Sequence, residues 1–183
     1  ENISKVYQDK VWGLRDFNMD VEQVEQVISP QTKAILPVHL NGRLCNMAKL
    51  MEIAHKHNLL VIEDAAQALG ASFDGKKAGS FGLAGCFSFY PAKILGAAGD
   101  GGLVATNSRE LAEKIRLLRD HGRRTKEDIA CFGFNSRLDN LQAAILNMKL
   151  KYLPQWIERR RELANIYHQG LSDIPYLKLP QPP

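Results

Sequence analysis

The sequence predicts an α/β fold in which a mostly parallel sheet is flanked by helices and followed by long helices. Strand-like apolar segments alternate with segments of helical spacing over residues 18–122, and this alternation is typical of a parallel sheet. The run LLVI at residues 59–62 is continuously apolar, as in a strand covered on both faces. From residue 136 onward, apolar residues recur with helical periodicity instead.

The first part of the chain predicts two helices and two strands. Residues 18–28 (NMDVEQVEQVI) combine an Asn/Asp start with helical spacing, and residues 33–40 (KAILPVHL) form a strand between a proline and an Asn-Gly pair. A second helix is expected over residues 45–58, and a strand begins at residue 59. The apolar face of the second helix comprises Met47, Leu50, Met51 and Ala54.

Two strands and a helix are expected next. The strands are residues 85–91, which end in a proline, and residues 101–107. Residues 108–122 predict a helix with Ser108 as its N-cap and Gly122 just past its end. A long helical pattern then begins at Ser136. Pro154 should kink or divide it, and its second part continues to about residue 170.

Composition and charge exclude several classes of partner. Of the 183 residues, 45% are hydrophobic and 24% are charged, and the formal net charge is +4. Much of the positive excess lies in HGRR (121–124) and ERRREL (158–163), which we interpret as solvated helix faces rather than phosphate-binding patches. No aromatic residues alternate with them, and no apolar segment is long enough to cross a membrane. Neither nucleic acid nor a membrane is an expected partner.

The cysteines favour a reducing compartment. Cys45, Cys86 and Cys131 are odd in number, far apart and without a Cys-x-x-Cys spacing. This pattern disfavours both a disulfide framework and a zinc site, so no metal is expected. Free thiols in the cytoplasm are the simplest interpretation.

Two charged residues follow neighbouring predicted strands. Asp64 comes after LLVIE, and Lys93 lies in the apolar run CFSFYPAKIL. Parallel sheets place ligands at the carboxyl ends of their strands. A partly desolvated lysine and a nearby carboxylate are what pyridoxal phosphate requires, because its aldehyde forms a Schiff base with an amine and an acid holds its ring nitrogen protonated. The hydroxyl of Ser88 is a candidate phosphate ligand, and the glycines in GAAGDGG (96–102) allow a close backbone approach.

Each of these residues also has an ordinary structural interpretation. Asp64 could cap the turn after its strand, and Lys93 could extend its amine to the surface from a strand end. Ser88 could be a satisfied strand hydroxyl.

Longer motifs decide between these interpretations. Residues 61–107 contain EDAAQ-x-x-G, SF-x-x-x-K and GDGG in order, GFNSRLDNLQAAIL follows at 133–146, and ISPQTKAILPVHLNG precedes at 28–42. Together these blocks resemble the DegT/StrS family of sugar aminotransferases, which are fold-type-I enzymes that use pyridoxal phosphate. The resemblance covers nearly the whole chain.

The resemblance implies specific roles at the cofactor. Lys93 would hold the cofactor as a Schiff base and shuttle a proton, and Asp64 would pair with the pyridinium nitrogen. Gln67 would lie near the ring hydroxyl and Ser88 would bind the phosphate. Asn135 would reach the phosphate of the partner subunit in a homodimer.

The resemblance also implies a reaction, which is transfer of an amino group from glutamate to a nucleotide-linked keto-hexose in amino-sugar biosynthesis for surface glycans or secondary metabolites. Asp100 in GDGG favours the sugar 3-position. His39 and Arg137 are candidate substrate contacts, although His39 could equally be a satisfied core histidine. Asn41 stands where the family usually has tyrosine, which leaves substrate contacts there open.

The family pattern extends beyond both ends of this chain. We expect residues 1–150 to form part of the cofactor-binding large domain without its N-terminal portion. Residues 151–183 would be a long helix and linker leading to a small C-terminal domain. A complete member would be roughly twice this length.

Three other interpretations were considered. A sugar dehydratase of the same fold would carry histidine in place of Lys93. A nicotinamide-binding domain would need a third glycine and a helix after GDGGLV, where a strand is predicted instead. A catalytically inactive or regulatory relative would have no reason to retain Lys93, Asp64, Ser88 and Asn135 together.

Overall fold

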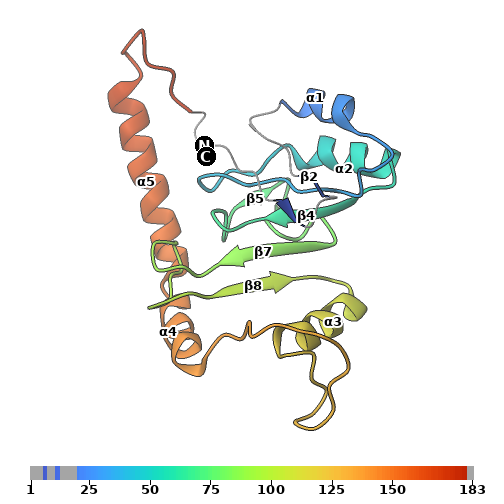
Figure 1. The fold of residues 1–183 in the computed structure, drawn as a ribbon. Coiled ribbons are helices and arrows are strands. Elements are labelled where there is room, and N and C mark those ends of the chain that lie inside the picture. Colours follow the sequence, from blue (N-terminus) through green and yellow to red (C-terminus); the bar gives the residue numbers. More distant parts are fainter. Residues whose placement is uncertain (1–5, 8–10, 13–19, 181–183) are drawn as a thin grey trace.

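The computed structural model describes residues 6–7, 11–12 and 20–180 and contains a four-stranded sheet (Figure 1). Its strands are β3 (Ala34–Ile35), β4 (Leu60–Asp64), β7 (Ala84–Ser88) and β8 (Gly102–Ala105), in that order. The first three are parallel and β8 runs antiparallel to β7. Helices accompany the sheet and two more follow it, so the predicted fold class is confirmed.

Two small hairpins lie outside this sheet. β1 (Val6–Tyr7) pairs with β2 (Val11–Trp12), and β5 (Ser72–Phe73) pairs with β6 (Lys76–Lys77). Neither hairpin was predicted from the sequence, although the Asp74–Gly75 turn of the second is a known hairpin signal: both residues have positive φ, 46° and 77°.

The strand expected at residues 33–40 is much shorter than predicted. β3 ends at Ile35, and pairing with β4 resumes only as an isolated bridge between Val38 and Asp64. Pro37 explains the interruption because it has no N–H to donate to a ladder. Its carbonyl still accepts from the Asp64 N–H at 2.9 Å, so the chain stays beside β4.

The helices largely follow their capping residues. The first is short, with α1 (Val21–Val24) continuing as the 3₁₀ turn η1 (Glu25–Val27), and residues 18–19 of the expected helix lie outside the described residues. α2 (Met47–Lys56) begins after Asn46, whose side chain accepts from the Lys49 N–H. α3 (Arg109–Arg119) has the predicted Ser108 cap.

The helical pattern expected from Ser136 begins four residues later. α4 (Asn140–Leu150) starts where Asp139 accepts the Gln142 N–H at 2.9 Å, which fixes its first turn. Pro154 divides the pattern as predicted, because it lies in the first turn of α5 (Leu153–Leu171), where its missing N–H is not needed. None of the helices in the described ranges is long and apolar enough to cross a membrane.

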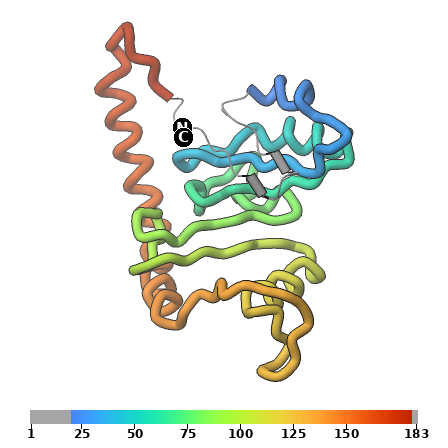
Figure 2. The backbone as a smooth tube through the Cα atoms, viewed as in Figure 1, coloured from blue at the N-terminus to red at the C-terminus, as the bar shows by residue number. Residues whose placement is uncertain are grey.

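The two larger apolar clusters hold the elements together. One joins the predicted face of α2 to Val61 of β4, with Met47 fully buried and Met51 packed at its margin. The other joins the segment after β7 to α4 and α5, and its buried members are Phe89, Leu95, Ala97, Leu146 and Leu153. Figure 2 shows the base of α5 at the edge of the sheet where β4 and β7 end.

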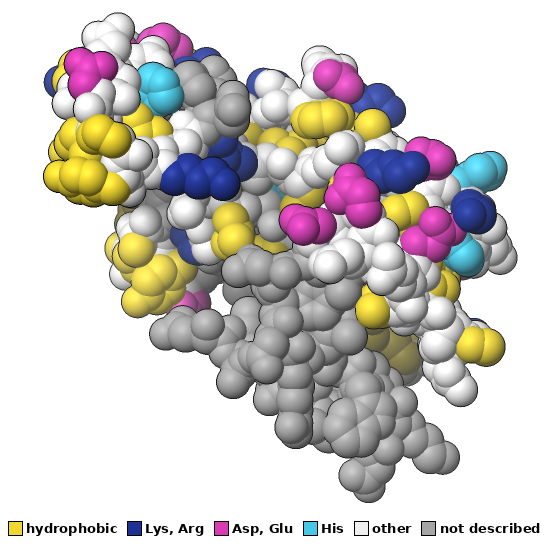
Figure 3. Space-filling view, turned by 90° about the horizontal axis from the view of Figure 1, so that it is seen from above, with side chains coloured by type: hydrophobic (Ala, Val, Ile, Leu, Met, Phe, Trp, Pro, Cys, Tyr) yellow, Lys and Arg dark blue, Asp and Glu magenta, His cyan; other side chains and the backbone are white. Residues whose placement is uncertain are grey.

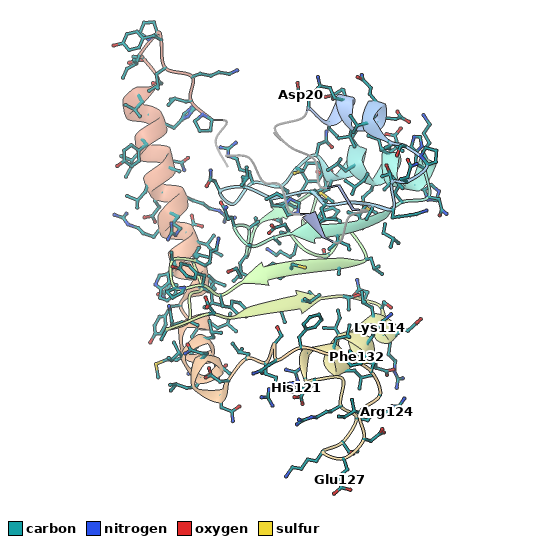
Figure 4. The ribbon with its side chains drawn as sticks, viewed as in Figure 1. Asp20, Lys114, His121, Arg124, Glu127 and Phe132 are labelled. Atoms are coloured by element: carbon teal, nitrogen blue, oxygen red, sulfur yellow. The ribbon has the colours of Figure 1, made fainter. Side chains whose placement is uncertain are left out.

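The two basic segments are solvated, but only one is helical. ERRREL lies exposed on α5, where Arg159 pairs with Glu162 and Arg161 with Glu158. HGRR lies in the loop after α3 rather than on a helix, because α3 ends at Arg119. Figure 4 shows Arg124 on this projecting loop, and Figure 3 shows acidic and basic side chains interspersed on the face seen from above.

Candidate active site

The carboxyl ends of β4 and β7 lie side by side and bring the predicted residues to one edge of the sheet. Asp64 ends β4 opposite Cys86, and Ser88 ends β7 two residues further along. β8 begins at this same edge, since Gly102 is paired with Ser88. The edge predicted to bind a ligand therefore carries an acid and a hydroxyl on neighbouring strands.

Asp64 does cap the turn that follows its strand, but with only one oxygen. Its Oδ1 accepts from the Ala66 N–H at 3.0 Å. Within the described part of the chain no hydrogen bond reaches Oδ2. The half-buried side chain thus retains an acceptor for a ligand. Burial raises the pKa of the adjacent Cys86 thiol and the charge of Asp64 raises it further.

Lys93 lies in a folded-back loop whose conformation is fixed by backbone bonds. Its own N–H donates to Tyr90 O at 2.9 Å, and the Ala97 N–H donates to Phe89 O at 2.8 Å. The second apolar cluster covers this loop from α4 and α5. Among the described residues, the half-buried Lys93 amine has no ion pair and no hydrogen-bond partner. An uncompensated amine in such a setting is available for chemistry.

Two side chains of α4 attach this loop to the helix. Gln142 Oε1 accepts from the Ala98 N–H at 2.8 Å, and Lys149 donates to the carbonyl of Gly96. The sequence pattern assigned α4 only apolar positions, so these two contacts were missed. The signal for the first contact was the QAA block, in which the polar Gln142 stands beside apolar residues.

Ser88 and Gln67 lie at the same edge. Ser88 Oγ accepts from the Tyr90 N–H at 3.2 Å, which leaves its hydroxyl proton to donate elsewhere. Gln67 follows the β4 turn and is exposed, and its side-chain Oε1 accepts from the Asn41 N–H at 3.3 Å.

His39 and Glu63 form a buried pair behind the edge. Both are 0% exposed, and His39 Nε2 lies 3.0 Å from Glu63 Oε2. The Cys45 N–H donates to His39 Nδ1, so Nε2 carries the proton and donates to Glu63. With both ring nitrogens bonded inside the chain, His39 has the satisfied-core arrangement that the sequence left open, and its role toward a substrate stays a prediction.

Glu63 was not singled out from the sequence, yet it is the most fully satisfied side chain near the site. Its Oε1 accepts from the N–H groups of Phe81 and Gly82, and its Oε2 accepts from Gly79 N–H as well as from His39. Burial raises the pKa of this carboxyl. The donors, led by Gly82 and His39, outweigh burial and leave the pKa below its usual value.

Asn135 and Arg137 form a separate group. Arg137 donates to Asn135 Oδ1 at 3.4 Å and lies 3.2 Å from Asp120 Oδ1, at the end of α3. Asn135 is also bridged to Asp120 through the backbone. The structure places Asp64 and Ser88 on neighbouring strand ends, with Lys93 in the loop after Ser88, and among the described residues no hydrogen bond or ion pair joins Asn135 or Arg137 to any of them.

A family model covers most of the chain. The model of the DegT/DnrJ/EryC1/StrS aminotransferase family matches residues 13–183. The chain belongs to this family. The resemblance inferred from the motifs is therefore confirmed.

Family members of known name are close in sequence. A pleiotropic regulatory protein of Geobacillus stearothermophilus is 50% identical over 157 residues, covering 86% of this chain and 42% of the relative. The dTDP-3-amino-3,4,6-trideoxy-α-D-glucose transaminase of Streptomyces venezuelae is 47% identical, covering 88% and 43%. The UDP-N-acetyl-3-dehydro-α-D-glucosamine 3-aminotransferase of Acidithiobacillus ferrooxidans is also 47% identical, covering 92% and 46%. The chain spans less than half the length of each.

Solved structures of family members share this fold. DesV of S. venezuelae, solved with a ketimine intermediate, has a TM-score of 0.83 and 46% identity over 88% of this chain and 45% of its own. NtdA of Bacillus subtilis, with bound PMP, has a TM-score of 0.80 and 38% identity over 90% and 38%. An Escherichia coli GDP-4-keto-6-deoxy-D-mannose-3-dehydratase with hydrated PLP has a TM-score of 0.80 and 29% identity, over 90% of this chain and 47% of its own. A protein solved with a ketimine intermediate, one solved with PMP and a dehydratase with hydrated PLP thus share this fold.

Proposed function

We propose that this chain forms part of an aminotransferase that uses pyridoxal phosphate to move an amino group from glutamate to a nucleotide-linked keto-hexose in amino-sugar biosynthesis. The observation that carries the proposal is that Lys93 lies in the loop that directly follows β7, the strand whose end presents Ser88 next to the end of β4 with Asp64. The names of the two sugar-nucleotide aminotransferases among the relatives support it.

The residues at this edge fit the cofactor. Asp64 has one carboxylate oxygen uncommitted, as needed to accept from a protonated ring nitrogen, and Ser88 has a hydroxyl proton to donate to a phosphate. Lys93 offers its amine for the covalent bond, and Gln67 offers a side-chain NH₂ toward the ring hydroxyl. When bound, pyridoxal phosphate supplies an electron sink for the carbon that loses its proton.

The chain's own groups then have distinct tasks. Lys93 Nζ removes and returns the proton of the reacting carbon, because it is the one basic group in its apolar loop. Asp64 retains its negative charge to hold a proton on the ring nitrogen. The contacts from Gln142 and Lys149 keep the lysine loop against α4, which limits the positions that the Lys93 side chain can take.

For the substrate we propose a 3-keto sugar attached to a nucleotide. The names of the Streptomyces and Acidithiobacillus relatives both refer to an amino group at the sugar 3-position. Asp100, whose residue type favours the same position, lies exposed in the loop before β8. Arg137 stays a proposed substrate contact because it is exposed and cationic. His39 also stays a proposed contact, but it is buried with both ring nitrogens bonded, so it would have to exchange one of these bonds to reach a substrate.

We propose a homodimer in which Asn135 reaches the phosphate of the partner's site. Its separation from Lys93 and Ser88 within the described chain supports a contribution across subunits. We also propose the domain division near residue 150, with α5 as the connecting helix. The three free cysteines support a cytoplasmic location.

A regulatory role is the second candidate, favoured by the name of the Geobacillus relative. A dehydratase remains the third, and the presence of Lys93 rather than histidine disfavours it. Lys93 distinguishes the three candidate functions: an aminotransferase needs it to bind the cofactor covalently, a dehydratase would carry histidine there, and an inactive regulator would not need a covalent cofactor.

The deciding experiment is chemical labelling of the full-length protein. We would incubate it with pyridoxal phosphate, reduce it with borohydride and map the modified peptide by mass spectrometry. A phosphopyridoxyl group on Lys93 supports the proposal. Replacing Lys93 with Ala should abolish transamination while the circular dichroism spectrum is unchanged. Wild-type turnover in that variant, or a label elsewhere, would overturn the assignment.

A further inference from the structure

The β-turn after β3 lies against the residue that the proposed function places at the cofactor ring. Leu40, Asn41, Gly42 and Arg43 form this turn, which is closed by the Arg43 N–H donating to Leu40 O at 2.9 Å. Its two central residues both have positive φ, 52° and 78°. Asparagine and glycine are the residues that adopt this conformation most readily.

Both central N–H groups of the turn point to Gln67. The Asn41 N–H donates to the side-chain oxygen of Gln67 at 3.3 Å, and the Gly42 N–H donates to its backbone oxygen at 2.9 Å. Because a backbone N–H can only donate, the carboxamide must present its oxygen to Asn41. The NH₂ group is therefore the end of the side chain left for a ligand.

The turn is itself anchored on its N-terminal side. His39, two residues before Asn41, is held by the buried Glu63 and by the Cys45 N–H, and its own N–H donates to Asp64 O at 3.0 Å. The segment that carries the turn is thus fixed to β4 at both its backbone and a buried side chain. The chain departs from the family's usual tyrosine at residue 41, and asparagine suits a positive φ better than tyrosine does.

We propose that the Asn41–Gly42 turn is a positioning device for Gln67, which fixes the carboxamide so that its NH₂ binds the ring oxygen of the cofactor. This inference rests on the proposed function. Residue 41 then acts through its backbone, and its side chain is not needed for the contact.

A second turn of the same geometry provides a matched control. Asp74 and Gly75, between β5 and β6, have φ values of 46° and 77°, and an added Cβ at Gly75 meets nothing within 4 Å. The same is true of Gly42 at φ 78°. Alanine therefore introduces equal backbone strain at either glycine without a clash, but only Gly42 contacts Gln67.

The test compares Gly42→Ala with Gly75→Ala in the full-length protein freed of cofactor and titrated with pyridoxal phosphate. We expect equal falls in melting temperature, but a dissociation constant for the cofactor raised about three- to tenfold in Gly42→Ala alone, as for the loss of one ordinary hydrogen bond. The visible absorbance of the bound cofactor should shift only in that variant. Equal effects of both substitutions, or none, overturn the inference.

Two further measurements keep the test decisive if Gly42→Ala folds poorly. Asn41→Gly keeps both N–H groups and tolerates positive φ, so cofactor affinity should stay within about twofold of wild type. A larger loss would mean that the Asn41 side chain is required, which contradicts the inference. In the cofactor-free protein, Gln67→Ala should accelerate hydrogen exchange at the Asn41 amide, and unchanged exchange there also contradicts it.

Failure of the inference can be told from failure of the proposed function. If borohydride labels Lys93 in the wild-type protein but the two glycine variants behave alike, only the positioning role is wrong. If no label appears on Lys93, the proposed function fails and the inference falls with it.

Discussion

Two glutamates, Glu63 and Glu25, have lowered pKa values for different physical reasons. Glu63 is wholly buried and is surrounded by four N–H donors, three of them backbone groups. Glu25 is 38% exposed and its Oε1 lies 2.6 Å from Lys56 Nζ and 2.7 Å from His57 Nε2. Water can replace the partners of the exposed Glu25 carboxylate but does not reach the buried carboxylate of Glu63, so the same direction of pKa shift implies unequal contributions to stability.

The largest expected effect comes from Glu63→Ala. It removes the acceptor of the Gly79 N–H, whose hydrogen bond is buried, and of the Phe81 and Gly82 N–H groups, whose hydrogen bonds are partly buried. We expect a loss of at least about 3 kcal/mol in the free energy of unfolding, measured by urea titration of the cofactor-free protein. Glu25→Ala is the matched control on the surface. Equal losses in the two variants would contradict the contrast between the two carboxylates.

The next largest effect is expected when His39, one donor to Glu63, is replaced instead of Glu63 itself. His39→Leu removes one of the four hydrogen bonds to Glu63 and leaves the Cys45 N–H without its acceptor, while the three backbone donors remain. We expect a smaller loss of about 1–3 kcal/mol. In a Glu63→Ala background, His39→Leu should cost less, because the two residues share one network. Additive losses in a double-mutant cycle would show that they act independently.

The contrast also shows what the sequence could reveal. β4 was predicted because its apolar run is local, and Asp64 and Lys93 were found because strand ends bind ligands. Glu63 was overlooked because its backbone donors lie 16 to 19 residues further along the chain. The only local sign that Glu63 is buried is that it and Asp64 are consecutive residues of one strand. Their side chains therefore point to opposite faces of the sheet.

The same argument explains the other differences. The sequence indicated the Asn41–Gly42 turn as the end of a strand. Its contact with Gln67 could not be predicted, because it depends on how the loop after β3 packs against the loop after β4. β3 is short because Pro37 interrupts the ladder, and α4 starts late because Asp139 captures the Gln142 N–H. Propensity identifies elements, whereas contacts between distant segments decide their ends and the buried polar network.

The acid response of Glu63 provides a prediction of intermediate size. Its folded pKa is depressed, so the stability that it contributes is complete above the unfolded pKa and is lost as pH falls through the folded pKa. Glu63→Gln cannot titrate, so we expect its unfolding free energy to fall less steeply than that of wild type below about pH 4.5. Parallel acid profiles for the two proteins would mean that Glu63 is not ionised in the fold.

The smallest effect is expected at Glu25. Its pKa is lowered to about 2, chiefly by the hydrogen bond from Lys56 and then by that from His57. Its contribution is therefore present above the unfolded value of 4.5 and is lost between there and about pH 2. Glu25→Gln should lower the melting temperature slightly at neutral pH, and the difference from wild type should vanish at the acid end of that window.

Salt distinguishes Glu25 from Glu63 most directly. Exposed ion pairs are screened by added salt, whereas a carboxylate enclosed by backbone N–H groups is not. Raising the NaCl concentration should therefore erase the small difference between Glu25→Gln and wild type, while the larger effect of Glu63→Ala persists. If salt leaves the Glu25→Gln difference intact, the contacts with Lys56 and His57 are shielded from solvent, and α1, η1 and α2 are joined by more than a surface pair.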